Sequence, residues 1–370
     1  MKKIALIAAM SLAALVSCTK NETAPSVTDQ QEITFASPIM SPATKAATEI
    51  ADNFPTANDF AVFAHYYENG YTTLGNGIQY MNNVQVTYGA TPGTNGSWGS
   101  NPAYYWPKGG SLTFAAYAPY MSTGATYDAT GIHFSDYQIA DLAEEQVDLL
   151  FSERAYDQTS ADQTDPNPYY YGVQINFLHA LSSIKFKVAM DPTLADSALD
   201  YVFVVTKIDV LNAYSKGNFN QNLTDGPNNK TPDAASGDWF DYQDETDYVA
   251  YNDATTGISL TDAEVKETVT GDNATNLILL PQKMKHGSAL DATDEVKVQV
   301  TYKMRHKEME AEEYITTVNE VSLNSSALVK EWFRGKRYVY TLTLGLEEIR
   351  FAPKVEAWKN QTVTDLPTIK

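Results

Sequence analysis

Apolar and polar residues alternate in several short segments of this chain, and this pattern predicts β-strands. The clearest alternation occurs in residues 173–177, 184–188, 296–300 and 338–346, where apolar side chains recur at every second position. A period of two places those side chains on one face of a strand, toward a core. Residues 60–66 and 112–117 are denser in apolar and aromatic side chains and are also predicted strands. No long segment has a helical period, and only residues 141–146 are predicted to form a helical turn. We therefore predict an all-β fold with few short helices.

A polar stretch divides the predicted strands into two groups. Residues 155–168 contain two prolines and almost no apolar side chains. A chain of 370 residues favours two domains by its length. We predict an N-terminal antiparallel β-sandwich over residues 49–168 and a C-terminal one over 169–370. Residues 212–257 are rich in Asp, Asn, Gly and Thr and are predicted to form a long loop or insertion carrying Trp239 and Phe240.

The first 18 residues have the organisation of a secretory signal peptide. Two lysines precede an apolar run from residue 4 to residue 16, which is too short to span a bilayer. The run ends in Leu15-Val16-Ser17-Cys18, which resembles a bacterial lipobox. Because Cys18 is the only cysteine, it has no disulfide partner within the chain. We predict that Cys18 is lipidated and anchors a precursor to the outer membrane. An ordinary signal peptide with an incidental cysteine is the alternative.

Residues 19–48 are predicted to be an extended tether, because they are rich in Thr, Ser, Ala and Pro. One part of the tether alternates like a half-buried strand, with Ile33 and Phe35 as its apolar positions. The tether ends near Lys45 and Ala46, in a run of small and polar residues of the kind that proteases cut.

Charge and motif content exclude several classes of function. The net charge is −20, which argues against nucleic acid as a partner. The five histidines lack metal-ligand spacing, the acidic clusters lack the calcium-loop pattern, and we predict neither a metal site nor a cofactor. No nucleophile elbow, phosphate-binding loop or dinucleotide fingerprint occurs, so no catalytic residue is predicted. Trp106, Trp332 and Trp358 are predicted to pack in cores or interfaces.

Six motifs in order along the chain resemble the fimbrillin family, the structural subunits of the type V pili of Bacteroidota. They are Tyr104-Tyr105-Trp106-Pro107 with residues 112–119, Asp148-Leu149-Leu150-Phe151-Ser152, residues 175–182, Leu279-Leu280-Pro281-Gln282, residues 335–340, and Val355-Glu356-Ala357-Trp358. The resemblance implies two transthyretin-like β-sandwich domains and a lipoprotein precursor. It also implies that an Arg/Lys-specific, trypsin-like protease removes the N-terminal segment, and that a strand from the next subunit fills the vacated groove. Lys45 stands where the family usually has an arginine before alanine.

The residues themselves support a physical interpretation of this route. Ile33 and Phe35 would plug an apolar groove, and cutting after Lys45 would allow their removal. An opened sheet edge is a template for a strand from another chain, as in the donor-strand complementation of pilins. Residues 362–370 are the candidate donor strand, with Val363, Leu366 and Ile369 as its apolar positions. Their alternation is imperfect, and Pro367 interrupts it.

Other interpretations of these segments stay open. In one alternative, residues 32–36 are an ordinary first strand that is never removed. Lys45 is then a linker residue, and residues 362–370 are a frayed C-terminal end. The chain would then be a monomeric, lipid-anchored surface protein that binds a glycan or another partner, or the adhesin at a pilus tip. A third hypothesis is an enzyme, such as a glycoside hydrolase with an accessory β-domain, which would require two carboxylates at a suitable separation in a cleft. The sequence favours a fimbrial subunit that assembles with other subunits at the cell surface and serves adhesion.

Overall fold

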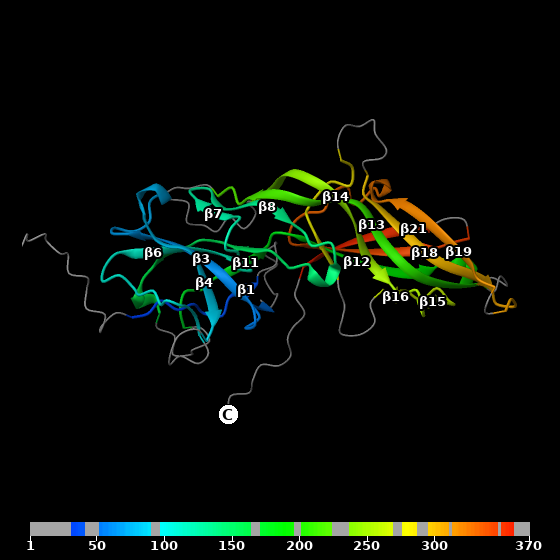
Figure 1. Cartoon of the computed structure of the whole chain (residues 1–370), viewed down its shortest axis with the longest axis horizontal. Helices are drawn as coiled ribbons and strands as arrows, with labels where there is room; N and C mark the ends of the chain where they lie inside the picture. Colours follow the sequence, from blue (N-terminus) through cyan, green and yellow to red (C-terminus); the bar gives the residue numbers. More distant parts are fainter. Residues whose placement is uncertain are drawn as a thin grey trace, which may run out of the picture.

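The computed structural model describes residues 31–40, 52–89, 97–163, 171–195, 201–223, 237–268, 276–286, 295–310, 313–346 and 349–358. The molecule is elongated, with strands from the first half of the chain at one end and strands from the second half at the other (Figure 1). Almost every regular element in this part of the chain is a β-strand, which confirms the predicted all-β class. No described helix is long and apolar enough to cross a membrane.

The N-terminal end is built around a nine-stranded sheet. Its strand order is β2-β1-β11-β9-β6-β3-β4-β5, and β10 also pairs with β6. The strands are β1 (Ile39–Met40), β2 (Asp52–Asn53), β3 (Asp59–Tyr67), β4 (Ile78–Tyr88), β5 (Trp98–Ser100), β6 (Ser111–Ala118), β9 (Leu150–Ser152), β10 (Ala155–Gln158) and β11 (Asn176–His179). Most neighbours are antiparallel, whereas β1 and β11 run parallel.

Strand β6 is buried at all eight positions. Leu112, Phe114 and Ala116 enter a core that lies inside the N-terminal sheet. Ala115 and Tyr117 enter a second core, which continues into the C-terminal half. The sheet therefore packs on both faces, and small residues such as alanine allow the close packing on the second face.

The C-terminal half contains two further sheets. A five-stranded sheet has the order β16-β12-β20-β21, with β17 paired to β12, and a seven-stranded sheet has the order β19-β18-β13-β8-β7, with β14 and β15 paired to β13. The strands are β7 (Ala125–Asp128), β8 (Gly131–Gln138), β12 (Ser182–Met190), β13 (Tyr201–Asn220), β14 (Asp238–Asn252), β15 (Ile258–Leu260), β16 (Lys266–Glu267), β17 (Leu277–Leu279), β18 (Lys297–His306), β19 (Ile315–Ser322), β20 (Lys336–Leu344) and β21 (Ile349–Ala357). Strand β8 comes from the first half of the chain and pairs with both β7 and β13, so strands from the two halves of the chain share one sheet.

Helical structure in the described part of the chain is confined to single turns. They are α1 (Pro192–Ala195) and the 3-10 turns η2 (Leu74–Asn76), η3 (Ala143–Glu145), η4 (Ser160–Asp162) and η5 (Leu323–Ser325). The turn η3 lies within residues 141–146, where the sequence predicted one helical turn. The predicted domain boundary near residue 168 stays a prediction.

The prediction of a long loop over residues 212–257 was wrong. These residues include the end of β13 and all of β14, which pair as an antiparallel ribbon, and Trp239 is buried in the larger core. The error has a physical cause: most side chains of β14 are exposed or half-buried, so its apolar alternation is weak. Register shifts also interrupt the pairing, and Asn212, Asp241 and Asp244 adopt the left-handed conformation that suits such irregularities.

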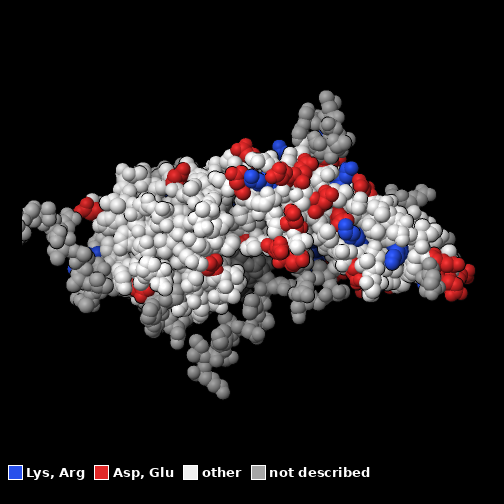
Figure 2. Space-filling view, in the orientation of Figure 1, with Lys and Arg blue, Asp and Glu red and all other residues white. Residues whose placement is uncertain are grey.

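Charged side chains are distributed unevenly. Figure 2 shows acidic and basic groups crowded over the C-terminal half, while the same face of the N-terminal half is largely uncharged. Between Lys45 and Lys185 the sequence contains just two basic residues, Lys108 and Arg154. Lys108 is exposed. Arg154 is buried, where its guanidinium donates to the hydroxyls of Tyr127 and Tyr71 at 2.7 and 2.9 Å.

Candidate functional site

The segment from Gln31 to Ala36 lies between two parts of the N-terminal sheet. On one side it runs antiparallel to the stretch from β5 to Trp106, with a bridge from Phe35 to Trp98. On the other side Phe35 forms a parallel bridge with Val173, just ahead of β11. The segment therefore joins the β5 edge to the chain that leads into β11, and closes the sheet on itself.

Five backbone hydrogen bonds hold the segment on both sides. Toward the β5 side, the Ile33 N–H donates to Tyr104 O (2.8 Å), the Phe35 N–H donates to Trp98 O (2.9 Å), and the Trp106 N–H donates to Gln31 O (2.9 Å). Toward the other side, the Val173 N–H donates to Thr34 O (2.9 Å), and the Ala36 N–H donates to Val173 O (3.1 Å). Removal of the segment would leave these groups unpaired in a buried groove, which is energetically costly.

The side chains from Ile33 to Ala36 are almost completely buried, whereas Gln31 and Glu32 are half-buried. Ile33 and Phe35 are each 1% exposed and belong to the N-terminal core. The ring of Phe35 packs edge-on against Phe60 and Phe114, with centroids 5.6 and 5.7 Å away. Burial of an aromatic ring of this kind contributes about 2–3 kcal/mol. The predicted apolar positions therefore fill a groove that the rest of the domain provides.

Gly172 lies at a point where the backbone of the segment passes very close to the neighbouring chain. A Cβ atom at this position would lie 2.6 Å from both Thr34 O and the carbonyl carbon of Phe35. Its φ of +120° is also one that other residues rarely adopt. The glycine therefore makes room for the strand beside Val173.

After Ala36 the chain continues along the sheet. The Phe54 N–H donates to Pro38 O at 3.0 Å, and β1 pairs parallel to β11 and antiparallel to β2. In the sequence, Lys45 and Ala46 lie between β1 and β2. A cut after Lys45 would therefore break the covalent link between the closing segment, together with β1, and the strands from β2 onward.

The other predicted site residues lie outside the described part of the chain. These residues are Cys18, Lys45, Ala46, Val363, Leu366 and Ile369. Trp106, Trp332 and Trp358 are buried, as predicted. No group of three or more metal-ligating side chains occurs among the described residues.

Two residues of the groove were not identified from the sequence. Trp98 follows a Gly- and Asn-rich stretch that is typical of a loop, yet its carbonyl accepts the bond from Phe35 and its side chain is buried. Gly172, directly before the alternating residues 173–177, carried a detectable signal, because a glycine at a strand end often marks a close backbone approach.

The chain matches the fimbrillin-like family over residues 44–358, which is most of its length. It therefore belongs to the fimbrillin-like family. Membership points to a structural, non-enzymatic protein and to a location in the cell-surface fimbrium.

Solved structures of fimbrial proteins are similar to this chain. A fimbrial protein from Bacteroides vulgatus ATCC 8482 shares its fold at 19% identity, covering 89% of this chain and 100% of that chain, with a TM-score of 0.55. The tip fimbrial protein Mfa3 from Porphyromonas gingivalis, with a C-terminal truncation, is similar at 9% identity and a TM-score of 0.38, covering 89% of this chain and 100% of that one. A search of curated proteins found no match.

Proposed function

We propose that this protein is a structural subunit of a fimbrium that polymerises by exchange of its N-terminal strand. Family membership supports the role of pilus subunit, since the match spans residues 44–358. The observation that carries the exchange route is the double-sided pairing of residues 31–36, which plug the groove with Ile33 and Phe35. A strand of the same shape from another subunit would restore the same backbone bonds.

The route begins with export of a lipoprotein precursor. Lipidation of Cys18 would hold it at the outer membrane, and the tether that follows would present Lys45 to a trypsin-like protease. Until the cut, residues 31–36 fill the groove and cover the apolar side chains around it. Covering an open sheet edge in this way prevents premature association.

The donor in this proposal is the C-terminal segment 362–370 of a neighbouring subunit. Its apolar positions, Val363, Leu366 and Ile369, would fill the places that Ile33 and Phe35 leave. The sparsely charged face of the N-terminal half also suits contact with a neighbour, because burying few charges avoids their desolvation cost (Figure 2).

Proteolysis of the lipid-free precursor (residues 19–370) with trypsin tests this function. We expect a new N-terminus at Ala46, read by mass spectrometry, followed by a ladder of oligomers or fibres in chromatography and electron microscopy. Lys45→Gln is expected to abolish both the cleavage before Ala46 and the formation of oligomers or fibres. Lys108→Gln is the matched control, since Lys108 is an exposed basic residue of the same half of the chain, and this variant should still be cut at Lys45 and polymerise. Arg154 should resist cleavage because it is buried.

Deletion of residues 362–370 then tests the donor. The trimmed deletion variant should stay monomeric. Polymerisation of this variant would exclude the C-terminal segment as donor. An intact chain that is trimmed at Ala46 and never polymerises would contradict the proposed stalk role and favour a tip subunit or an anchored binding protein.

A further inference from the structure

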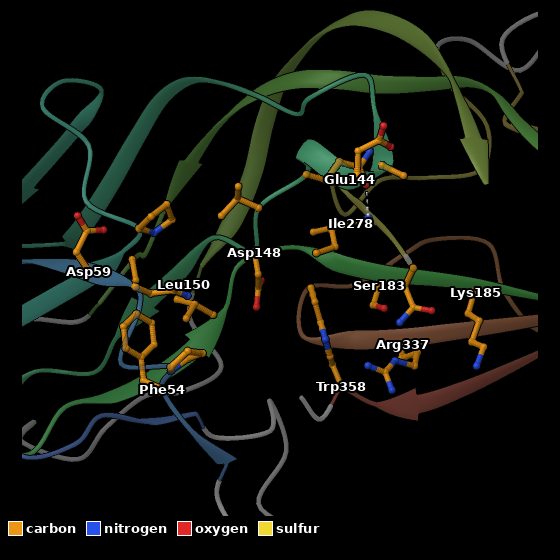
Figure 3. A pocket seen from close by; sticks show the side chains of 18 residues that line it. Phe54, Asp59, Glu144, Asp148, Leu150, Ser183, Lys185, Ile278, Arg337 and Trp358 are labelled. Carbon is orange, nitrogen blue, oxygen red and sulfur yellow. Dashed lines mark hydrogen bonds between the residues drawn. The ribbon is translucent and has the colours of Figure 1, made fainter. Parts of the chain in front are cut away.

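A cavity of about 500 Å³ lies between the two halves of the molecule, and none of residues 31–36 lines it. One wall comes from the N-terminal half and includes Phe54, Asp148 and Leu150. The opposite wall comes from the C-terminal half and includes Ser183, Arg337 and Trp358 (Figure 3). Cavities of this size at the junction of two units are common places for small ligands.

Three oxygen atoms on the cavity wall have no hydrogen-bond partner in the described part of the protein. They are Asp148 Oδ1, Ser183 Oγ and Asn276 Oδ1. Ser183 is only 1% exposed, so its hydroxyl is buried at a position where alanine would fit equally well. Buried polar groups without partners cost stability, and a cluster of them facing one cavity indicates that something else supplies the partners.

The cavity also presents an aromatic side chain held in a fixed orientation. Trp358 stacks on His179 with ring centroids 4.1 Å apart and planes 8° from parallel. Asp148 Oδ2 accepts a hydrogen bond from His179 Nδ1 at 2.6 Å, which fixes that imidazole. Figure 3 shows Trp358 between Asp148 on one side and Ser183 and Arg337 on the other. The aromatic surface and the unpaired oxygens therefore belong to one site.

We propose that this cavity binds a small polyhydroxylated ligand of monosaccharide to disaccharide size. Sugar hydroxyls both donate and accept, so they can satisfy the carboxylate, amide and hydroxyl oxygens together. The C–H face of a sugar ring suits the indole of Trp358, since tryptophan combines a large apolar surface with a polar edge. Arg337 adds donors for a ring oxygen or hydroxyl. A phosphate or sulfate fits less well, because the lining carboxylates (Asp59, Glu144 and Asp148) outnumber the lining cations (Lys185 and Arg337).

The decisive variant is Ser183→Ala, since it removes one unpartnered oxygen and leaves the volume almost unchanged. In the absence of ligand this change should raise the melting temperature, because a buried hydroxyl without a partner is removed. The same change should weaken ligand binding about three- to tenfold, as expected for the loss of one hydrogen bond. If Ser183 had a purely structural role, Ser183→Ala would not raise the melting temperature and weaken ligand binding at the same time.

The neighbouring Ser182 provides a matched control. It is fully buried on the same strand, but its hydroxyl donates to Phe333 O at 3.0 Å. Ser182→Ala should therefore lower the melting temperature and leave the ligand affinity unchanged.

The binding experiment uses the lipid-free chain (residues 19–370) and a panel of glucose, galactose, N-acetylglucosamine, N-acetylneuraminic acid and lactose. Saturation-transfer NMR identifies which sugar binds, and calorimetry measures its affinity. We expect at least one sugar to bind and Ser183→Ala to weaken it. The absence of binding at millimolar concentrations of every sugar would overturn the proposal, as would an affinity that Ser183→Ala leaves unchanged. Because the intact precursor is used, these outcomes are independent of strand exchange.

Discussion

Gly172 and Phe35 approach each other so closely that a single added carbon atom would collide with the N-terminal strand. A Cβ on Gly172 would lie 2.6 Å from the carbonyl carbon of Phe35, well inside van der Waals contact. The adjacent Val173 forms the parallel bridge to Phe35. The groove is therefore shaped for a backbone that passes at this point, whichever chain supplies it.

Gly172→Ala should disrupt the seating of the N-terminal strand. The added methyl group meets backbone atoms that cannot move aside, and φ at this position is +120°. We expect a loss of about 2–4 kcal/mol in the free energy of unfolding, measured by urea titration. Gly89→Ala is the matched control, since φ there is +72° and nothing lies within 4 Å of the added carbon. If both variants lost the same free energy of unfolding, the positive φ alone would explain the effect of Gly172→Ala, and the steric contact with the N-terminal strand would contribute nothing.

Phe35→Ala should destabilise the precursor by about 3–5 kcal/mol, because it leaves a cavity between Phe60 and Phe114. The control is Phe333→Ala, whose side chain is 57% exposed and whose loss should change the free energy of unfolding by less than about 0.5 kcal/mol. Chemical denaturation of both variants measures the difference. A small effect of Phe35→Ala would contradict the role of this ring as the plug of the groove.

Cleavage after Lys45 should not by itself release the N-terminal strand. Five backbone hydrogen bonds and the buried side chains of Ile33 and Phe35 remain in place when the peptide bond is cut. We therefore expect residues 19–45 to co-elute with the trimmed chain in native gel filtration when residues 362–370 are deleted. Their appearance as a free peptide should require a competing donor strand. Immediate loss of the peptide from the monomer would show that the groove holds it weakly.

Stability should fall in alkaline solution because several buried tyrosines must remain neutral. Burial raises the pKa of Tyr117, Tyr127 and Tyr338 to about 12, from 10.0 for an exposed tyrosine. Above pH 10 the unfolded chain therefore loses these protons first, and stability present below pH 10 declines as the pH rises toward 12. Each such tyrosine should contribute a slope of about 1.4 kcal/mol per pH unit.

Urea titrations at several alkaline pH values measure this slope. The variant Tyr117→Phe should be less stable at neutral pH, because it loses a hydroxyl that lies within hydrogen-bond distance of Asn83 Oδ1 and Met121 O and can donate to either. Its stability should also fall less steeply above pH 10. A slope unchanged by this substitution would exclude Tyr117 as a contributor.

The sequence predicted those elements whose two faces differ in polarity. Alternation in residues 184–188 and 296–300 identified β12 and the start of β18, because one face of each strand points to a core. The same reasoning failed for β14, whose buried positions are few. Nor could it show that β6 is buried on both faces, since a central strand of this kind resembles any dense apolar run.

The candidate site was predictable in part. Ile33 and Phe35 were identified because they alternate with polar residues inside an otherwise polar tether. Trp98 and Val173, which flank Phe35, could not be assigned to it, because pairing between segments more than 60 residues apart leaves no local pattern. The cavity near Trp358 was equally hidden, since Asp148, Ser183 and Asn276 come together only in the fold.

Hydrogen exchange at the amides of Trp106 and Val173 tests strand replacement most directly. These N–H groups donate to Gln31 O and Thr34 O, so they report whether the groove is occupied. We predict slow exchange in the precursor and slow exchange again in the assembled fibre. The reference for an empty groove is the trimmed chain without residues 362–370, from which residues 19–45 have been removed under mild denaturant. In that sample both amides should exchange fast. Fast exchange of both amides in the fibre would mean that no strand replaces residues 31–36, and would contradict the proposed assembly.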